Sequence, residues 1–220
     1  MEQILDLWLK YYPVYLSGLW GTLWISAVTV LFGTVLGMLI ALMRMSKSKV
    51  LNVISTAYIE ILRGTPALLQ LYFFWLGLPK ILPFMELSDT ACILVAMTVN
   101  ASAYISEILR AGINAVDKGQ WEAARSIGLS EVNVMTRVIL PQAVKNILPA
   151  LCNEFISTIK GTSLASVFFV GELMTAQKSV AAATYLSLHS LVIAGVIYFT
   201  ITFTLSKLLK VLERRLPVSD

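Results

Sequence analysis

Charged residues are scarce in this sequence, and histidine and cysteine are scarcer still. Only 14% of the 220 residues are charged, and there are one histidine and two cysteines. A soluble domain carries about 25% charged residues, so this composition excludes an ordinary soluble protein. Both Cys92 and Cys152 fall inside apolar stretches. That setting favours small buried side chains over a disulfide or a metal site.

Apolar residues are correspondingly abundant. They make up 57% of the chain, and the mean hydropathy is +0.77. The first apolar run is uncharged from Pro13 to Met43, 31 residues, whereas about 20 are enough to span a membrane. Glu2 and Asp6 stand where a signal peptide needs basic residues. The run is therefore predicted to be a membrane-spanning helix and not a cleaved leader.

Five segments are predicted to cross the membrane. They are residues 17–43, 54–79, 89–110, 146–170 and 184–206. The fourth is the weakest, because Glu154 and Lys160 interrupt it. We therefore expect an all-α membrane protein with five transmembrane helices in a single domain, residues 1–220.

The lysines and arginines predict the orientation of these helices. Thirteen of the 17 basic residues follow the first, third and fifth spans or enter the second, whereas Lys10, Lys80 and Lys178 lie on the opposite side. Because basic residues are concentrated on the cytoplasmic side, we expect the N-terminus outside and the C-terminus in the cytoplasm. Topology thus accounts for the net charge of +4, and no nucleic acid partner is expected.

The first span contains the pattern Gly33-x-x-x-Gly37. Small residues one helical turn apart let two membrane helices approach closely. The pattern therefore predicts close packing of this helix against another one.

The connection between the third and fourth spans is too long to be a simple linker. Within it, residues 117–142 are predicted to form two short helices around Gly128, which can take the positive φ that ends a helix. Ser130 is a favoured first residue for the second helix, and Pro141 is expected to limit its continuation. The element fits an amphipathic hairpin on the inner leaflet or a docking element for a soluble partner.

Part of this connection resembles a known motif. It begins with Glu122-Ala123-Ala124, and after three further residues comes Gly128. Nine more residues separate Gly128 from Val138-Ile139-Leu140-Pro141. This spacing resembles the EAA loop of ABC importer permeases, with Val138 in place of an isoleucine. Two further segments resemble the polar amino acid branch of that family: Arg63-Gly64-Thr65-Pro66 with Gln70 and Gly77-Leu78-Pro79, and Thr162-Ser163-Leu164 after Lys160. Gly161 departs from that branch, whose members often carry aspartate there.

The resemblance implies a type I importer fold and a division of labour. It implies a second permease subunit, identical or a paralogue, a dimer of cytoplasmic ATPase subunits, and an extracytoplasmic solute-binding protein that delivers an amino acid. ATP and Mg²⁺ would bind the ATPase, since this sequence has no G-x-x-x-x-G-K-[ST] loop. The chain itself is expected to be no enzyme, to bind no cofactor and to lie among lipids in the bacterial plasma membrane.

The resemblance also implies which residues couple the permease to the ATPase. They are Glu122, Ala123, Ala124, Gly128, Leu140 and Pro141. The small side chains of Ala123 and Ala124 would let the two surfaces approach closely.

A polar face on the fourth span is the candidate substrate pathway. Glu154, Thr158 and Gly161 share one helical stripe, and Asn153, Ser157 and Lys160 share the next. Ionisable groups in a span often mark a pathway, and this pair could receive both charges of an amino acid. Thr162 and Ser163 extend this face, and Asn100 and Tyr104 are weaker candidates in the third span. The alternative is pairing between helices, with Lys160 reaching toward an interface.

Four charged residues near the cytoplasmic side form two pairs with the same spacing. Glu107 and Arg110 stand three residues apart, as do Glu60 and Arg63. Each pair is expected to form an ion pair along its own helix.

The sequence also fits two rival functions. Gly161-Thr162-Ser163-Leu164 fits the motif of a rhomboid-like intramembrane serine protease, in which His189 would be the base. A stand-alone secondary transporter is the other, although such proteins often contain internal repeats, which this sequence does not show.

Overall fold

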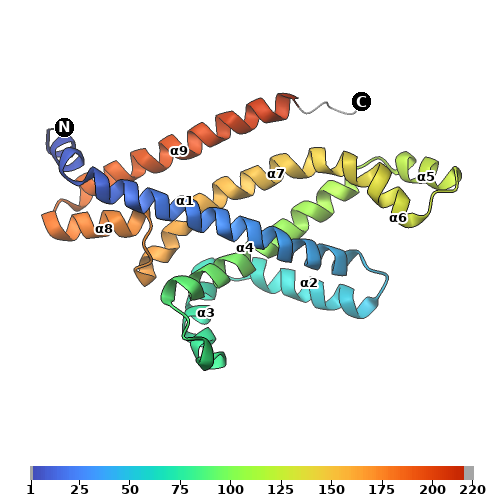
Figure 1. Ribbon diagram of the computed structural model, residues 1–220, viewed down its shortest axis with the longest axis horizontal. Helices are drawn as coiled ribbons and strands as arrows, with labels where there is room; N and C mark the ends of the chain where they lie inside the picture. The colour runs from blue at the N-terminus through green and yellow to red at the C-terminus, as the bar shows by residue number, and fades with distance from the viewer. Residues whose placement is uncertain (1, 216–220) are drawn as a thin grey trace.

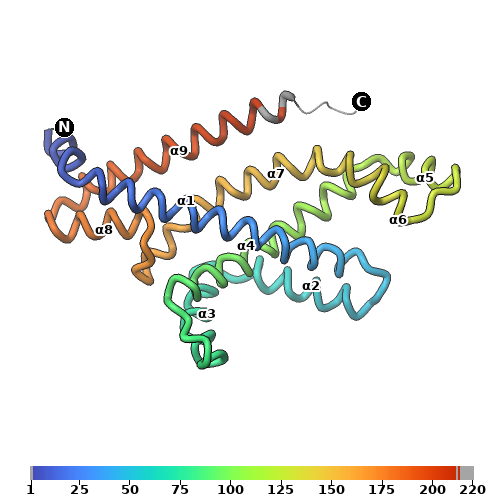
Figure 2. Tube along the Cα trace, in the orientation of Figure 1, coloured from blue at the N-terminus to red at the C-terminus, as the bar shows by residue number. Residues whose placement is uncertain are grey.

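The computed structural model describes residues 2–215, which form helices and short connections without any β-strand in that part of the chain (Figure 1). The elements are α1 (Glu2–Met45), α2 (Lys49–Gly64), α3 (Ala67–Ile81), η1 (Pro83–Met85), α4 (Asp89–Asn114), α5 (Lys118–Ser126), α6 (Glu131–Asn133), η2 (Val134–Ile139), α7 (Leu140–Gly161), η3 (Thr162–Phe168), α8 (Leu173–Thr184) and α9 (Ser187–Arg215). Figure 2 shows α1 running through the middle of the molecule, with the α5–α6 region projecting at the opposite end from α8.

Three of the helices are long and apolar enough to cross a membrane by length and composition. These are α1, α4 and residues Ser187–Val211 of α9. They correspond to the first, third and fifth predicted spans. The helix α3 is apolar but has only 15 residues, and α7 carries the polar face that weakened the fourth prediction.

The helix α1 packs most extensively against α4, and Gly33 and Gly37 lie in that contact. A Cβ atom built on Gly33 would lie 3.3 Å from the Ala101 Cβ, and one on Gly37 would lie 3.0 Å from the Ser102 carbonyl oxygen. The predicted close packing of these glycines is therefore confirmed, and its partner is another helix of the same chain.

The second predicted span is wrong as a single helix, because it is broken into α2 and α3. Thr65 has an extended backbone, with φ −117° and ψ 150°. The ring of Pro66 disfavours helical geometry at the residue before it, and Pro66 itself has no N–H to donate. The break therefore follows from local chemistry at the Thr65-Pro66 step.

Pro141 does not end a helix, contrary to the prediction, since α6, η2 and α7 follow one another without interruption. The segment Val134–Ile139 is a π-helix, and the Leu140 N–H reaches back five residues to the Met135 carbonyl. This wider turn immediately precedes Pro141, the second residue of α7, and the chain stays helical past a residue that has no N–H to donate. Within the fourth predicted span, the α-helix ends at Gly161 and the chain continues as the 3₁₀ helix η3.

The connection between η3 and α8 is tightly packed against α1. Glu172 is fully buried and caps α8, where its carboxylate accepts hydrogen bonds from the Met174 and Thr175 N–H groups at 2.7 and 2.6 Å. The Tyr198 hydroxyl of α9 donates to the same carboxylate at 3.1 Å. One acidic side chain therefore ties α8 to α9.

Candidate functional site

The first candidate site is the helical hairpin formed by α5 and α6. Gly128 has φ +80°, and the Leu129 N–H bonds the Ala124 carbonyl at 3.2 Å. This bond closes the end of α5 in the manner of a Schellman cap. Ser130 caps α6 by accepting a hydrogen bond from the Asn133 N–H. The predicted pair of helices around Gly128 is thus confirmed.

An ion pair joins the two helices of the hairpin. The Arg125 guanidinium donates two hydrogen bonds of 3.0 Å to the Glu131 carboxylate. These bonds lower the pKa of Glu131 from its usual value. Both side chains are exposed, so the pair adds little stability, but its two-bond geometry orients α5 relative to α6.

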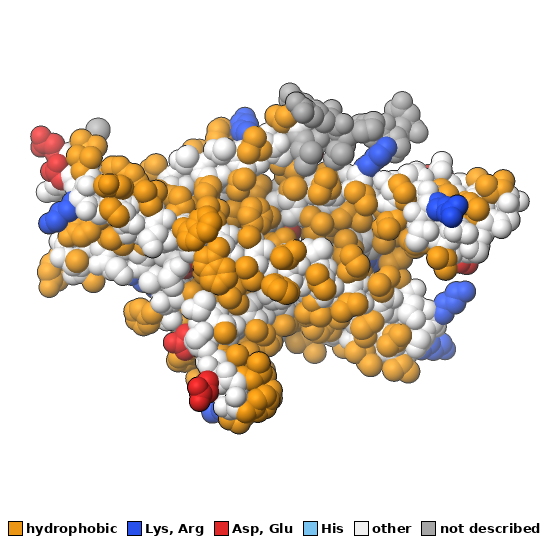
Figure 3. All heavy atoms as spheres, in the orientation of Figure 1, with side chains coloured by type: hydrophobic (Ala, Val, Ile, Leu, Met, Phe, Trp, Pro, Cys, Tyr) orange, Lys and Arg blue, Asp and Glu red, His pale blue; other side chains and the backbone are white. Residues whose placement is uncertain are grey.

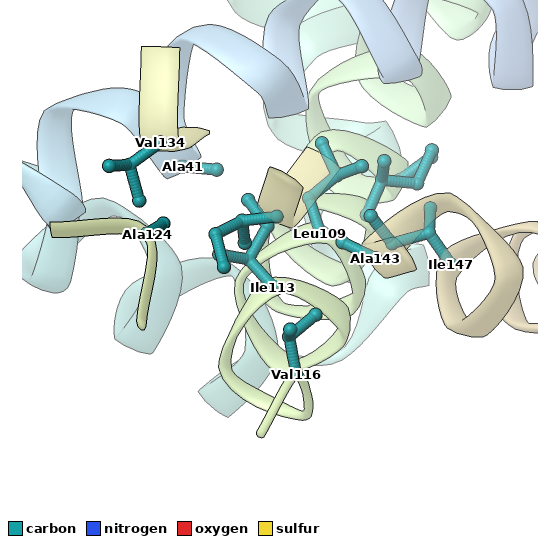
Figure 4. Packing of buried hydrophobic residues seen from close by; sticks show 11 residues of the cluster. Ala41, Leu109, Ile113, Val116, Ala124, Val134, Ala143 and Ile147 are labelled. Atoms are coloured by element: carbon teal, nitrogen blue, oxygen red, sulfur yellow. The ribbon is translucent and has the colours of Figure 1, made fainter. Parts of the chain in front are cut away.

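The inner face of the hairpin is packed into the body of the same chain. Ala124 is 4% exposed and belongs to a cluster with Leu109, Ile113, Val134 and Ile139. Figure 4 shows this cluster drawing together side chains from α4, α5, the π segment and the first turns of α7. Packing inside this chain therefore accounts for the small size of Ala124.

The outer face of the hairpin is left open. Glu122 and Ala123 are exposed, and two large apolar side chains beside them, Ile127 and Val132, are 78% and 71% exposed. Leu140 and Pro141 are also exposed, further along the chain. Lys and Arg side chains appear at this end of the molecule in Figure 3. The hairpin thus presents apolar and small residues on a projecting element.

The second candidate site is a cavity of about 260 Å³ between α1, α3, α4 and α7. Its walls combine apolar and polar side chains: Thr29, Ala67, Leu71, Met97, Asn100, Ala101, Tyr104, Glu154, Ser157, Thr158, Gly161 and Leu164. The predicted stripe Glu154, Thr158 and Gly161 lies entirely in this wall. Five of the predicted pathway residues, together with Gly161, are therefore brought together.

Three predicted pathway residues lie elsewhere. Lys160 is exposed and is not among the residues that line the cavity. Thr162 is buried and its hydroxyl donates to the Ile159 carbonyl at 2.8 Å, while the Ser163 hydroxyl donates to the Lys160 carbonyl at 2.8 Å. Ser157, which shares the stripe of Lys160, lines the cavity, whereas Lys160 does not, so the cavity wall contains Glu154 without its predicted basic partner.

Polar groups that the sequence did not single out complete the cavity wall. Thr29 of α1 is buried, and among the side chains that the structure describes its hydroxyl is the one buried polar atom without a hydrogen-bond partner. Other hydroxyls, such as that of Ser26, bond a carbonyl of their own helix. Nothing in the local pattern distinguishes Thr29, because only the packing of α1 against α4 and α7 turns it toward the cavity.

A charged cluster connects the cavity to the end of α1. The Glu107 carboxylate binds Arg110 at 3.0 Å and Arg44 at 2.8 Å, with Arg63 at 3.8 Å. The predicted pair of Glu107 with Arg110 is confirmed, whereas Arg63 turns to Glu107 and not to Glu60. Its guanidinium also lies 5.5 Å from the ring centre of Tyr104. Arg63 thus lies beside a residue of the cavity wall.

The arrangement does not assemble a serine protease. The Ser163 hydroxyl is bonded to a backbone carbonyl of its own helix, and His189 lies in the first turn of α9. Within the described residues no hydrogen bond joins these two side chains.

The comparisons with known proteins define the family. Residues 33–217 match the model of the binding-protein-dependent transport system inner membrane component family. The chain belongs to this family of transport permeases. The resemblance of residues 122–141 to an ABC importer permease is thereby confirmed.

Individual relatives agree with this assignment. The chain is 40% identical over 208 residues to the arginine transport system permease protein ArtQ of Bacillus subtilis, covering 94% of both chains. It is 36% identical to a putative glutamine transport system permease protein GlnP of Rickettsia conorii, covering 96% of this chain and 98% of that one. Both relatives are named as permeases, and each match covers nearly the full length of both chains.

Solved structures match as well. A chain from the crystal structure of an amino acid ABC transporter with histidines has a TM-score of 0.90 and 43% identity, covering 94% of this chain and 96% of that one. A chain of the MetNI methionine ABC transporter in an inward-facing conformation has a TM-score of 0.69 at 18% identity, which shows a shared fold. The comparisons favour the importer permease over the secondary transporter and the protease.

Proposed function

We propose that this chain forms the translocation pathway of an ATP-driven importer for a polar amino acid in the plasma membrane. The observation that carries the proposal is the cavity between α1, α3, α4 and α7, which gathers Asn100 and Glu154 from different helices. A second permease subunit, an ATPase dimer that binds ATP and Mg²⁺, and an extracytoplasmic binding protein complete the transporter. The names of the relatives support an amino acid as the cargo.

The proposal includes five membrane crossings with the N-terminus outside. Residues 44–50 and residues 117–142, which include the hairpin, would then be cytoplasmic, and residues 80–88 and 172–183 external. The concentration of basic residues after the first, third and fifth crossings supports this orientation.

Cysteine labelling tests the orientation directly. Ser48 and Ser88 are both exposed, so Ser48→Cys and Ser88→Cys can each be made in a background without Cys92 and Cys152. We expect a membrane-impermeant maleimide added to intact cells to label Ser88→Cys and not Ser48→Cys. Both should react in opened membranes. Labelling of Ser48→Cys alone in intact cells would reverse the proposed orientation.

Within the cavity, Glu154 is the group proposed to receive a positive charge. Its carboxylate has no ion-pair partner among the side chains that the structure describes. A carboxylate in a low-dielectric site attracts a cation more strongly than one in water, and it accepts but cannot donate hydrogen bonds. Tyr104 and Ser157 add hydroxyl groups to the same wall.

We expect Glu154→Gln to reduce amino acid uptake about tenfold to a hundredfold, since a hydrogen bond to a charged group contributes about 1.5–3 kcal/mol. Assembly and basal ATPase activity should persist, because the amide keeps the shape of the side chain. Uptake and ATP hydrolysis are measured in the same proteoliposomes. Lys160→Met is the matched control on the same helix, and it should transport normally. Normal uptake by Glu154→Gln would remove this residue from the pathway.

A further inference from the structure

Gln70 joins the break between α2 and α3 to the cavity. Its side chain is buried, and its Nε2 donates to the Leu62 carbonyl at 2.8 Å and to the Thr65 carbonyl at 3.2 Å. It also donates to the Thr65 hydroxyl oxygen at 2.8 Å. That hydroxyl gives its own hydrogen to the Ile61 carbonyl. Every neighbour at this end of the Gln70 amide therefore accepts hydrogen bonds.

This set of acceptors decides which way the Gln70 amide is turned. A carbonyl oxygen cannot donate, so placing Oε1 against Leu62 and Thr65 would set oxygen against oxygen. The nitrogen must therefore face the break, and Oε1 must face the other way. There the Asn100 Nδ2 donates to it at 2.8 Å.

The orientation of Asn100 follows from that of Gln70. Because Oε1 of Gln70 can only accept, the neighbouring group of Asn100 must be its NH₂. The Asn100 Oδ1 is then the atom left for the cavity, and among the described residues nothing donates a hydrogen bond to it. An asparagine could otherwise present either a donor or an acceptor to a ligand.

The rest of the cavity agrees with an acceptor at this position. The Glu154 carboxylate in the same wall likewise accepts only. A ligand group that meets both the Asn100 Oδ1 and the Glu154 carboxylate must donate hydrogen bonds and gains from carrying a positive charge.

We infer that Gln70 is a positioning residue that holds the Asn100 oxygen toward the cavity, so that the cavity selects a ligand through a cationic N–H group. The inference rests on the proposed role of the cavity in binding an amino acid. Two groups of an amino acid have this chemistry, the α-ammonium and a basic side chain. The probes below distinguish them.

The test measures equilibrium binding to the purified permease–ATPase complex in lipid nanodiscs. The probes are L-arginine, L-citrulline, which has a neutral side chain of nearly the same shape, and Nα-acetyl-L-arginine, which lacks the α-ammonium. In Gln70→Met the Asn100 amide is free to turn. We expect the affinity for the cationic group to fall about tenfold, the effect of one hydrogen bond to a charge.

The pattern across probes identifies the group that is recognised. A loss for L-arginine without a loss for L-citrulline assigns the basic side chain to Asn100. Equal losses for both, together with no binding of Nα-acetyl-L-arginine, assign the α-ammonium. Unchanged affinities, or equal losses with Nα-acetyl-L-arginine still bound, would overturn the inference.

Two further variants separate positioning from a general loss of structure. Gln70→Glu still offers Asn100 an oxygen, so it should keep the affinity for the cationic probe although it disturbs the break. Asn100→Leu should lose that affinity, and adding Gln70→Met to it should cause no further loss, because Gln70 acts through Asn100. If the Gln70→Met complex does not assemble, the affinities of Gln70→Glu and Asn100→Leu for the cationic probe test the positioning role instead.

The experiments distinguish failure of the proposed function from failure of the positioning role of Gln70. If the unaltered complex binds none of the three probes and Glu154→Gln transports normally, the cavity is not the amino acid site. If the unaltered complex binds L-arginine and Glu154→Gln does not, yet Gln70→Glu and Gln70→Met behave alike, only the positioning role of Gln70 is wrong.

Discussion

Ala123→Trp should separate the permease from its ATPase while leaving the permease folded. Ala123 is exposed on the open face of α5, beside Glu122 and close to the projecting Ile127. An indole on this face would hold the ATPase groove away from the small and apolar residues that are proposed to enter it. Loss of a central interface contact costs about 2–4 kcal/mol, so association should weaken about thirtyfold or more.

The measurement is co-purification of the ATPase, with ATP-driven uptake in the same preparation. Ala124→Trp is the matched comparison, because Ala124 is its neighbour in sequence but is 4% exposed inside the chain's own cluster. That variant should instead lower the melting temperature of the permease itself, since overpacking costs about 1–3 kcal/mol or more. If Ala123→Trp retains the ATPase and transports at the normal rate, the open face of the hairpin is not the coupling surface.

Gly21→Ala should destabilise the packing of α1 against the connection before α8. A Cβ atom on Gly21 would clash with the Gly171 carbonyl oxygen, which is a backbone atom and cannot simply rotate away. Relief requires a shift of α1 or of the segment that holds the buried Glu172. We expect a loss of about 3 kcal/mol or more, at the upper end of the cost of overpacking.

Thermal unfolding of the detergent-purified complex measures this loss. Gly195→Ala is the control, because Gly195 also lies in a long helix but a Cβ there meets nothing within 4 Å. Alanine favours the helix over glycine, so the control should be neutral or slightly more stable. Equal melting temperatures for the two variants would show that α1 and the α8 connection separate without cost.

The features that the sequence predicted correctly depend on neighbours along the chain. Gly128 and Ser130 end one helix and begin the next through hydrogen bonds that span a few residues. The apolar runs of α1, α4 and α9 are long enough to read directly as candidate spans. The pair of Glu107 with Arg110 lies within one turn of one helix. Such features are largely local, so the sequence specifies them.

Two prolines have effects on the helices that differ from those predicted. The Thr65-Pro66 step breaks the second predicted span because the proline ring disfavours a helix before it. Pro141 was expected to stop a helix, yet the wider turn of the π segment precedes it and the chain remains helical. At Pro66 the steric effect of the ring on the preceding residue breaks the helix, whereas at Pro141 the helix continues after the π segment.

What the sequence by itself determined is therefore the helical membrane class, the hairpin with its caps, and the stripe of Glu154, Thr158 and Gly161. Tertiary structure alone decided which surfaces of those elements are covered. It buried Ala124 and left Ala123 open, and it left Lys160 exposed and outside the cavity wall. It also set the Gln70 amide between a helix break and Asn100, 30 residues further along the chain. The physical reason is that helical periodicity defines the faces of one helix, whereas contact between helices determines which face meets protein, lipid or ligand.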